Sequence, residues 1–193
     1  MEKQSLASML KGENIKLKTK LDEMESTLTR IAGSVHIFSA GASESKIDLY
    51  TKITEVISKA RENLKIVTPK IGPEFAKILI DKAKTGTKIQ VVINDRRILV
   101  EETKLAKAHK NSDVNYEKTY DLLKITPEID LINNPNVRFS MVWTRKNVVF
   151  AGGWLEKSLL KKTILLGVHV QDIAKIEELQ HIYRQLLPSF MRK

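Results

Sequence analysis

The side chains best placed for ligand chemistry follow two short apolar, β-branched runs, residues 64–67 and 89–93. Each run predicts a strand, and ligands of α/β sheets bind just beyond the carboxyl ends of the strands. Cationic and hydroxyl groups at such a rim would bind a phosphate or another acidic ligand, whereas a solvated turn is the alternative interpretation. The candidate ligand-binding residues at the two rims are Thr68, Lys70, Asp95, Arg96 and Arg97.

A second candidate site surrounds the turn formed by Arg145 and Lys146, which Trp143 and Trp154 flank in the sequence. An aromatic ring beside cations suits stacking on a nucleobase or a sugar. The alternative is that both tryptophans simply pack in the core. We therefore predict that the two tryptophans bind a ligand and that the two cations bind nucleic acid.

Two further groups of lysines are candidates for binding the phosphates of a nucleic acid. One group is spaced by three along a predicted helix, residues 99–110, so its members lie near one another. The other stands in a polar connection, residues 156–162. A solvated lysine surface is the alternative in both cases. The residues are Lys104, Lys107 and Lys110 in the first group and Lys157, Lys161 and Lys162 in the second.

The composition favours a polyanionic partner. The 193 residues include 33 Lys and Arg against 23 Asp and Glu, which gives a formal net charge of +10. A basic surface attracts nucleic acid because neutralising phosphates releases condensed counterions. A Lys- and Glu-rich surface of the kind found in thermophilic proteins is the other interpretation.

The composition also excludes several classes of site. The chain has no cysteine, which rules out disulfides and thiolate metal ligands, and its four histidines are scattered. We expect neither metal nor cofactor, and we interpret His169 as a core residue of a buried strand. No run approaches eighteen apolar residues, and the N-terminus lacks the apolar region of a signal peptide. The expected location is the cytoplasm, with no membrane contact.

The elements that must position these side chains begin with a strand–helix–strand unit at residues 62–95. Pro73 suits the first turn of a helix, and Gly86 can end that helix by adopting a left-handed backbone. A strand, a helix and a strand of these lengths predict parallel strands joined by a right-handed crossover. The chain is therefore expected to contain an α/β sheet domain.

Hydrophobic periodicity predicts the remaining elements. A nearly continuous apolar run, residues 163–170, is typical of a strand buried on both faces. Residues 129–132 are interpreted as a turn or a short strand. Helices are predicted over residues 47–60, 99–110, 116–124 and 173–186, and further strands over residues 35–38, 137–143 and 148–151.

Residues 1–32 predict a coiled-coil dimerisation helix. Apolar residues step by four and three along a narrow seam with polar flanks, and Asn14 on that seam would fix register and strand number. A helix that packs this stripe against its own domain is the alternative. We predict a homodimer formed through this helix. The seam residues are Leu10, Leu17, Leu21, Met24, Leu28 and Ile31.

The order of several segments resembles a known family. These segments are VHIFSAGAS, ISKARENLKIVTP, KAKTGTKIQVVI, NNPNVRFSMVW, KNVVFAGGW and LQHIYRQLLPSF. Over residues 34–190 their order resembles the phospholipase D-like fold, and more particularly the C-terminal effector domain of archaeal TrmB-type transcriptional regulators. The resemblance implies an α/β domain over residues 34–193, with a mixed sheet and helices on both faces.

The resemblance also implies what the domain lacks. Active phospholipase D-like enzymes have a His-x-Lys and a later Asp ahead of a Gly-Ser-x-Asn strand end, where the His is the nucleophile and the Lys cradles the phosphate. None of the residues aligned with this pattern offers such a nucleophile or cation, so no catalytic residue is expected. A winged helix like that of the regulators is not found either. The aligned residues are Val137, Phe139, Thr144, Gly152 and Trp154.

We therefore expect a non-catalytic, dimeric regulatory or nucleic-acid-binding protein, which contacts DNA directly or through a DNA-binding partner protein. One alternative is a sensor for a sugar or a phosphorylated metabolite, with its crevice near Thr68, Lys70, Asp95 and Arg97. The other alternative is a diverged phosphodiesterase or nuclease.

Overall fold

The computed structural model describes residues 14–24, 35–40, 48–108, 114–163 and 165–191. By its internal contacts the chain divides into two units, Met1–Ser34 and Val35–Lys193. No helix in these ranges is both long and apolar enough to cross a membrane.

In the first unit, residues 14–24 are helical, as the sequence predicts. Leu17, Leu21 and Met24 on this helix are 62–64% exposed, so the described part of the predicted seam is uncovered in a single chain. The coiled coil itself stays a prediction. Its other seam positions lie outside the described residues: Leu10, Leu28 and Ile31.

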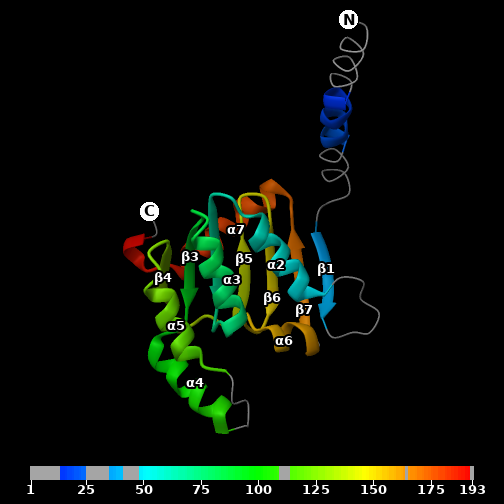
Figure 1. Ribbon diagram of the computed structural model, residues 1–193. Helices are drawn as coiled ribbons and strands as arrows, with labels where there is room; N and C mark the ends of the chain where they lie inside the picture. The colour runs from blue at the N-terminus through cyan, green and yellow to red at the C-terminus, as the bar shows by residue number, and fades with distance from the viewer. Residues whose placement is uncertain (1–13, 25–34, 41–47, 109–113, 164, 192–193) are drawn as a thin grey trace, which may run out of the picture. The chain divides into compact units, whose positions relative to one another are not determined.

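The second unit is built on one seven-stranded mixed sheet with the strand order β1-β7-β6-β5-β2-β3-β4 (Figure 1). β2, β3 and β4 run parallel, whereas β5, β6, β7 and β1 continue the sheet in antiparallel pairs. The strands are β1 (Val35–Ala40), β2 (Asn63–Thr68), β3 (Lys88–Ile93), β4 (Ile129–Asn133), β5 (Phe139–Trp143), β6 (Val148–Gly152) and β7 (Leu165–Val170).

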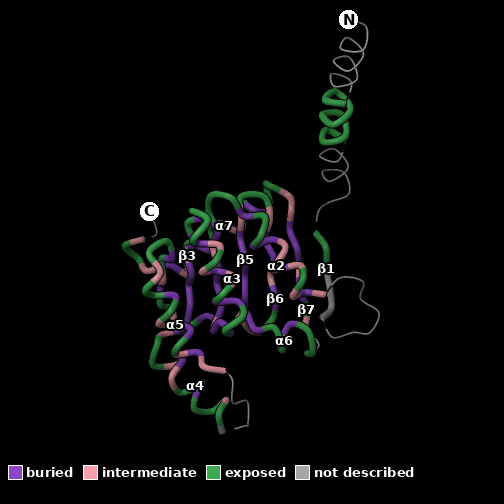
Figure 2. Tube along the Cα trace, viewed as in Figure 1, coloured by how far each residue is buried: buried purple, intermediate pink, exposed green. Residues whose placement is uncertain are grey.

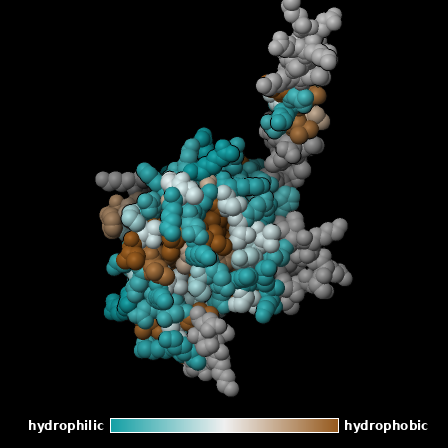
Figure 3. Space-filling model, in the orientation of Figure 1, coloured by the Kyte–Doolittle hydropathy of each residue, from teal (hydrophilic) through white to brown (hydrophobic). Residues whose placement is uncertain are grey.

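Helices cover both faces of this sheet. Figure 1 shows α2 and α3 crossing one face and α7 lying behind the other. The face with α2 and α3 is mostly hydrophilic where it meets solvent (Figure 3). The helices are α2 (Leu49–Lys59), α3 (Pro73–Ala83), α4 (Arg96–Ala108), α5 (Tyr116–Lys124), α6 (Lys157–Lys162) and α7 (Ile173–Leu186).

The predicted strand–helix–strand unit is confirmed as β2, α3 and β3. Its two strands pair in parallel, with Leu64 opposite Ile89. Pro73 is at the start of α3, where its missing N–H leaves no helical hydrogen bond unmade. Gly86 has a φ of +86°, which a residue with a Cβ rarely adopts. The sequence signals that predict this unit are therefore the ones that shape it.

Two apolar cores hold the layers together, and the buried residues follow the central strands (Figure 2). The larger core lies between the sheet and helices α2, α3 and α5, and includes the fully buried side chains of Ile53, Phe75 and Leu79. The smaller core lies under α7 and includes Trp143 and Tyr183, whose rings meet edge to face with centroids 5.8 Å apart. Burying such side chains stabilises a fold by about 1.5–3 kcal/mol each.

Three local predictions are wrong. The polar connection predicted at residues 156–162 contains α6, which packs through the buried Leu160. The helix predicted from residue 99 begins earlier, so that Arg96 and Arg97 belong to α4. β7 is not buried on both faces, since Leu166 is 63% exposed. β7 lies one strand from the sheet edge.

Candidate functional site

A buried polar cluster lies where β2 ends. Because β5 and β6 run antiparallel there, the start of β5 and the end of β6 meet the end of β2. The Thr68 hydroxyl lies 2.9 Å from both the Lys70 carbonyl and the Ser140 hydroxyl, and it accepts from the Leu155 N–H at 3.2 Å. Ser140 donates in turn to the Gly153 carbonyl at 3.1 Å. These bonds join three strand ends that are distant in the sequence.

Lys70 is the cation of this cluster, and its side chain is only 10% exposed. Its ammonium group donates to the Glu102 carboxylate in a close ion pair. The same group lies 3.9 Å from the ring centroid of Trp154 and 4.7 Å from that of Tyr116. A cation held by a carboxylate and two ring faces is already well satisfied.

Glu156 is the anion of the cluster. Its carboxylate accepts hydrogen bonds from the Tyr116 hydroxyl, from the Ser158 hydroxyl and, at 2.8 Å, from Trp154 Nε1. Burial alone would raise the pKa of Glu156, but these bonds and the charge of Lys70 outweigh it, so the pKa lies below its ordinary value. Burial and the neighbouring Glu156 carboxylate raise the pKa of the Tyr116 phenol. The carboxylate is therefore held ionised and the phenol neutral.

The structure thus brings Thr68, Lys70 and Trp154 together, as part of one network. Sequence reasoning missed the other members because they come from β5, α4, α5 and the segment after β6. The pairing of β2 with β5 brings Ser140 to Thr68, whereas Glu102 and Tyr116 come from the helices α4 and α5. The missed residues are Glu102, Tyr116, Ser140 and Glu156.

The residues aligned with the catalytic pattern lie along β5 and β6. Val137 is fully buried, and the half-buried Phe139 packs near Phe150, with ring centroids 6.4 Å apart. The Thr144 hydroxyl donates to the Asn147 carbonyl across the β5–β6 turn at 3.2 Å. Gly152, which has no side chain, ends β6, and Trp154 belongs to the network around Lys70. Within the described part of the chain, no group of His, Asp and Glu side chains is placed to hold a metal ion.

The second predicted rim, after β3, is occupied by an ion-pair cluster. Arg96 Nε lies 2.9 Å from Asp121 Oδ1, and its Nη2 lies 2.6 Å from Glu117 Oε1. The hydrogen bond and charge of Asp121 raise the pKa of the Arg96 guanidinium, and Arg96 lowers that of Asp121. These bonds join α4 to α5. Asp95 is half-buried at the start of α4, and Arg97 is exposed beside it.

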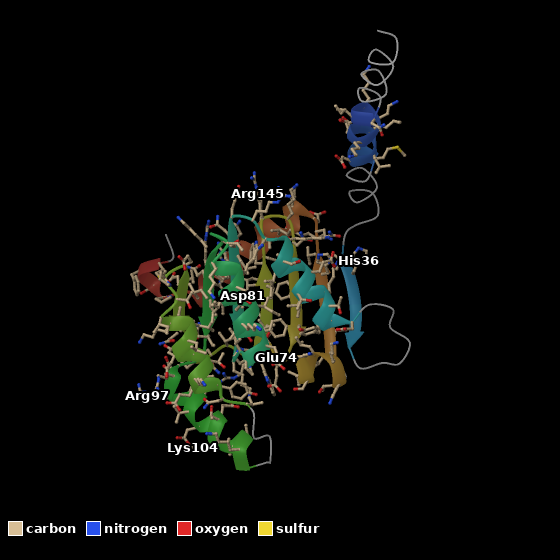
Figure 4. The ribbon with its side chains drawn as sticks, in the orientation of Figure 1. His36, Glu74, Asp81, Arg97, Lys104 and Arg145 are labelled. Carbon is tan, nitrogen blue, oxygen red and sulfur yellow. The ribbon has the colours of Figure 1, made fainter. Side chains whose placement is uncertain are left out.

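The predicted lysine groups lie on two separate helices. Lys104 on α4 donates to Glu101 at 2.8 Å, Lys107 is exposed, and Lys110 lies outside the described residues. On α6, Lys161 lies 3.9 Å from Asp48, while Lys157 and Lys162 are exposed. Figure 4 places Lys104 and Arg97 on α4, well away from Arg145 at the opposite end of the sheet. The predicted cations do not form one surface.

A basic cleft lies at that opposite end, where β2 starts and β5 ends, and its volume is about 680 Å³. Because Lys65 pairs with Trp143, the β5–β6 turn lies beside the segment that leads from α2 into β2. Glu62 is its one acidic lining residue. Five basic residues line it: Lys59, Arg61, Lys65, Arg145 and Lys146. The last two were candidates from the sequence, and the first three were missed because they are scattered over an α–β connection.

The positive charge of the cleft has little compensation. Lys59 pairs with Glu55 at 2.6 Å, but the other four basic lining residues form no ion pair with a described residue. Burial, together with the charge of Arg184, lowers the pKa of Lys65 below its ordinary value. An anion in the cleft would relieve this repulsion between like charges.

The two tryptophans do not form a joint site. Trp143 is 4% exposed and lies under Lys65, whose ammonium is 5.8 Å from its ring centroid. Its buried ring forms part of the floor of the cleft and is not open for stacking. Trp154 lies beyond the far end of β6, in the network around Lys70.

Comparisons by sequence find no family model and no curated protein that matches this chain. Comparisons by structure find many matches. NucT from Helicobacter pylori has a TM-score of 0.59 at 15% identity, over 79% of this chain and 94% of NucT. Nuc from Salmonella typhimurium, a phospholipase D family member, has a TM-score of 0.57 at 14% identity, over 79% of this chain and 92% of Nuc.

A third structural match extends over more of this chain. TrmBL2, an archaeal chromatin protein described as having a novel mode of DNA binding, has a TM-score of 0.50 at 16% identity. The match covers 94% of this chain and 64% of TrmBL2, so this chain corresponds to less than two thirds of that protein. Identities of this size establish a shared fold and nothing finer.

Proposed function

We propose that this chain, whose sheet domain has the phospholipase D-like fold, binds nucleic acid in the basic cleft without cleaving it. The observation that carries the proposal is the cleft itself. Arg61, Lys65, Arg145 and Lys146 converge there with a single acidic residue, Glu62, among the lining side chains. Phosphates of a polynucleotide would neutralise these cations and release condensed counterions.

The distribution of charge supports a site in the sheet domain. Residues 1–34 contain six basic and five acidic side chains, so nearly all of the net charge of +10 belongs to residues 35–193. An excess of positive charge accelerates the encounter with a polyanion, and a cleft lined by positive charges concentrates their electric field.

A binding role without catalysis is supported by the residues at the position of the catalytic pattern. Val137 and Phe139 provide neither a nucleophile on phosphorus nor a cation for the phosphate. Lys70, the nearest buried ammonium at that end of the sheet, is held by Glu102. We expect no turnover of a generic phosphodiester substrate. Turnover that disappeared on replacing His169 would contradict this part of the proposal.

The TrmBL2 match supports the same class of function, because that chromatin protein binds DNA. By this analogy we propose a regulatory role and a dimer formed through the helix in residues 1–32, in which two clefts would act on one polymer. Sedimentation of the full chain and of residues 35–193 tests the dimer. An unchanged oligomeric state after truncation would contradict it.

Charge reversal tests the cleft directly. The double variant Arg145→Glu/Lys146→Glu should bind single-stranded and duplex oligonucleotides at least about tenfold more weakly than the parent at low salt, because two phosphate contacts become repulsive. The matched control is Lys157→Glu/Lys162→Glu on α6, which makes the same change in charge at exposed positions.

The outcomes of this experiment separate the possible faces. If only the α6 variant lost affinity for oligonucleotides, the binding surface would be on α6 and not in the cleft. Equal small losses of affinity in both variants would indicate a diffuse effect of the net charge. A flat response of the parent protein with every oligonucleotide at low salt would refute direct nucleic-acid binding.

A small anionic ligand is the second candidate, and the size of the cleft favours it. A volume of about 680 Å³ is typical of pockets for small molecules. Two results together would favour this function: a phosphorylated metabolite raises the melting temperature of the protein, and oligonucleotides do not bind to it. The melting temperature reports binding because a ligand that binds only the native state stabilises that state.

A further inference from the structure

A second pocket, of about 550 Å³, adjoins the basic cleft. The two share Asn63 and Lys65 as lining residues, so they form neighbouring parts of one groove over the starts of β2 and β3. The second pocket extends the groove to β4 through Gln90 and Asp130, which are opposite each other in the parallel pair β3–β4. A ligand that fills the cleft therefore has room to continue into this pocket.

A chain of hydrogen bonds fixes the polar groups of the second pocket. The buried Tyr183 hydroxyl of α7 donates to Gln90 Oε1, which turns the amide nitrogen of Gln90 toward β4. Gln90 Nε2 then donates to Asp130 Oδ2 at 2.9 Å. Because Tyr183 is anchored in the core under α7, Asp130 is held in one orientation on the surface.

The pocket presents acceptors that the described residues leave unused. The second carboxylate oxygen of Asp130 has no hydrogen-bond partner among them, and neither has the Glu128 side chain. Both residues are exposed. Two carboxylates repel a phosphate but accept hydrogen bonds from an amino group, so this pocket differs in chemistry from the cleft beside it. Lys88 also lines this pocket, and its ammonium group is a cation available for a further phosphate contact.

We propose that this pocket binds an amine-bearing nucleobase of a single strand whose phosphates lie in the basic cleft. The proposal rests on the proposed function and names its substrate class. Cytosine, adenine and guanine present an exocyclic amine, and carboxylates accept from it. Thymine and uracil present carbonyl oxygens there, which carboxylates repel. Lys65, which borders both pockets, contacts the phosphate that joins the two parts of the ligand.

The strand must be single because pairing conceals the amine edge of a base. Sequence-selective recognition of unpaired nucleic acid reads the exposed base edges, whereas the phosphates supply affinity without selectivity. The expected preference is roughly five- to tenfold per base read, at the low end of the range for good base contacts because the carboxylates are exposed.

The test compares oligo(dC), oligo(dT) and an abasic oligomer of equal length by fluorescence anisotropy. The two pyrimidines have the same ring size. At position 4 cytosine has an amine and thymine a carbonyl, and thymine also has a methyl group at position 5. The parent should bind oligo(dC) roughly five- to tenfold more tightly than oligo(dT). The variant Asp130→Asn/Glu128→Gln should reduce that ratio to near one, partly by strengthening the binding of oligo(dT).

The matched control is Glu74→Gln/Asp81→Asn, which removes two charges from α3 on the other face of the sheet (Figure 4). This control should keep the parent ratio. Equal binding of all three oligomers by the parent, or a ratio that the Asp130 variant leaves unchanged, overturns the base pocket and leaves the cleft standing. If the parent binds none of the oligomers, the proposed function fails, and the base pocket with it.

Discussion

Replacing Glu156 by Gln should destabilise the fold while leaving nucleic-acid binding intact. The substitution keeps the shape of the side chain but removes its charge and turns one acceptor oxygen into a donor. In the parent, the carboxylate accepts from Tyr116, Trp154 and Ser158. The Trp154 indole can only donate, whereas the two hydroxyls can also accept. A Gln amide can direct its oxygen toward Tyr116 and Trp154 and its nitrogen toward the Ser158 hydroxyl, so the substitution turns three charge-assisted hydrogen bonds into neutral ones and removes the attraction to Lys70.

The magnitude follows from those contacts. A hydrogen bond to a charged group contributes about 1.5–3 kcal/mol, whereas a hydrogen bond between neutral groups contributes about 0.5–1.5 kcal/mol. Glu156 is 8% exposed, so solvent screens these interactions little. The weakening of three charge-assisted bonds and the loss of the attraction to Lys70 predict that the free energy of unfolding falls by about 2–4 kcal/mol.

Urea denaturation measures this loss, with Ser158→Ala as the control that removes one partner at an exposed position. The control should cost about 1 kcal/mol. Because the folded-state pKa of Glu156 lies below the ordinary 4.5, its contribution is complete above that pH and disappears as the pH falls through the folded value. The variant should therefore resemble the parent in acid.

Two results would refute this reasoning. A loss below about 0.5 kcal/mol would mean that the network does not stabilise the fold. A large loss of oligonucleotide affinity at unchanged stability would mean that this end of the sheet, and not the basic cleft, is the binding site.

Two further predictions concern stability. Gly153→Ala should cost about 1 kcal/mol more than Gly86→Ala, since both have positive φ but a Cβ at Gly153 would lie 2.7 Å from Leu159 Cδ2, whereas Gly86 has open space. Equal melting temperatures for the two variants would contradict this. Burial, with the charge of Lys52, lowers the pKa of His169 to about 4, so stability present above pH 6.5 should decline toward pH 4, by at most about 3 kcal/mol. His169→Gln should flatten denaturation midpoints measured between pH 7 and 5, and an unchanged slope would count against it.

The sequence predicts much of this fold because local signals and the tertiary structure agree. The runs at residues 64–67 and 89–93 become adjacent parallel strands, and Pro73 and Gly86 bound the helix between them. The resemblance to the phospholipase D-like fold is confirmed by the structural matches. The narrower prediction of a regulator rests on the TrmBL2 match and remains a proposal.

The sites are harder to predict, because they depend on which strands pair. Thr68 and Ser140 are 72 residues apart in sequence and meet only through the antiparallel pair of β2 and β5. Lys65 joins Arg145 for the same reason, at the other end of that pair. Periodicity identifies strands but not their neighbours, so the cations could be named from the sequence without being grouped correctly.

The salt dependence of binding to a single-stranded oligonucleotide tests the central claim most directly. For the parent, the logarithm of the association constant should fall linearly with the logarithm of salt concentration. For Arg145→Glu/Lys146→Glu the slope should be shallower by about 1.4, since each phosphate contact on a single strand contributes about 0.7. Identical slopes for the two proteins, or no dependence on salt, would contradict binding in the cleft.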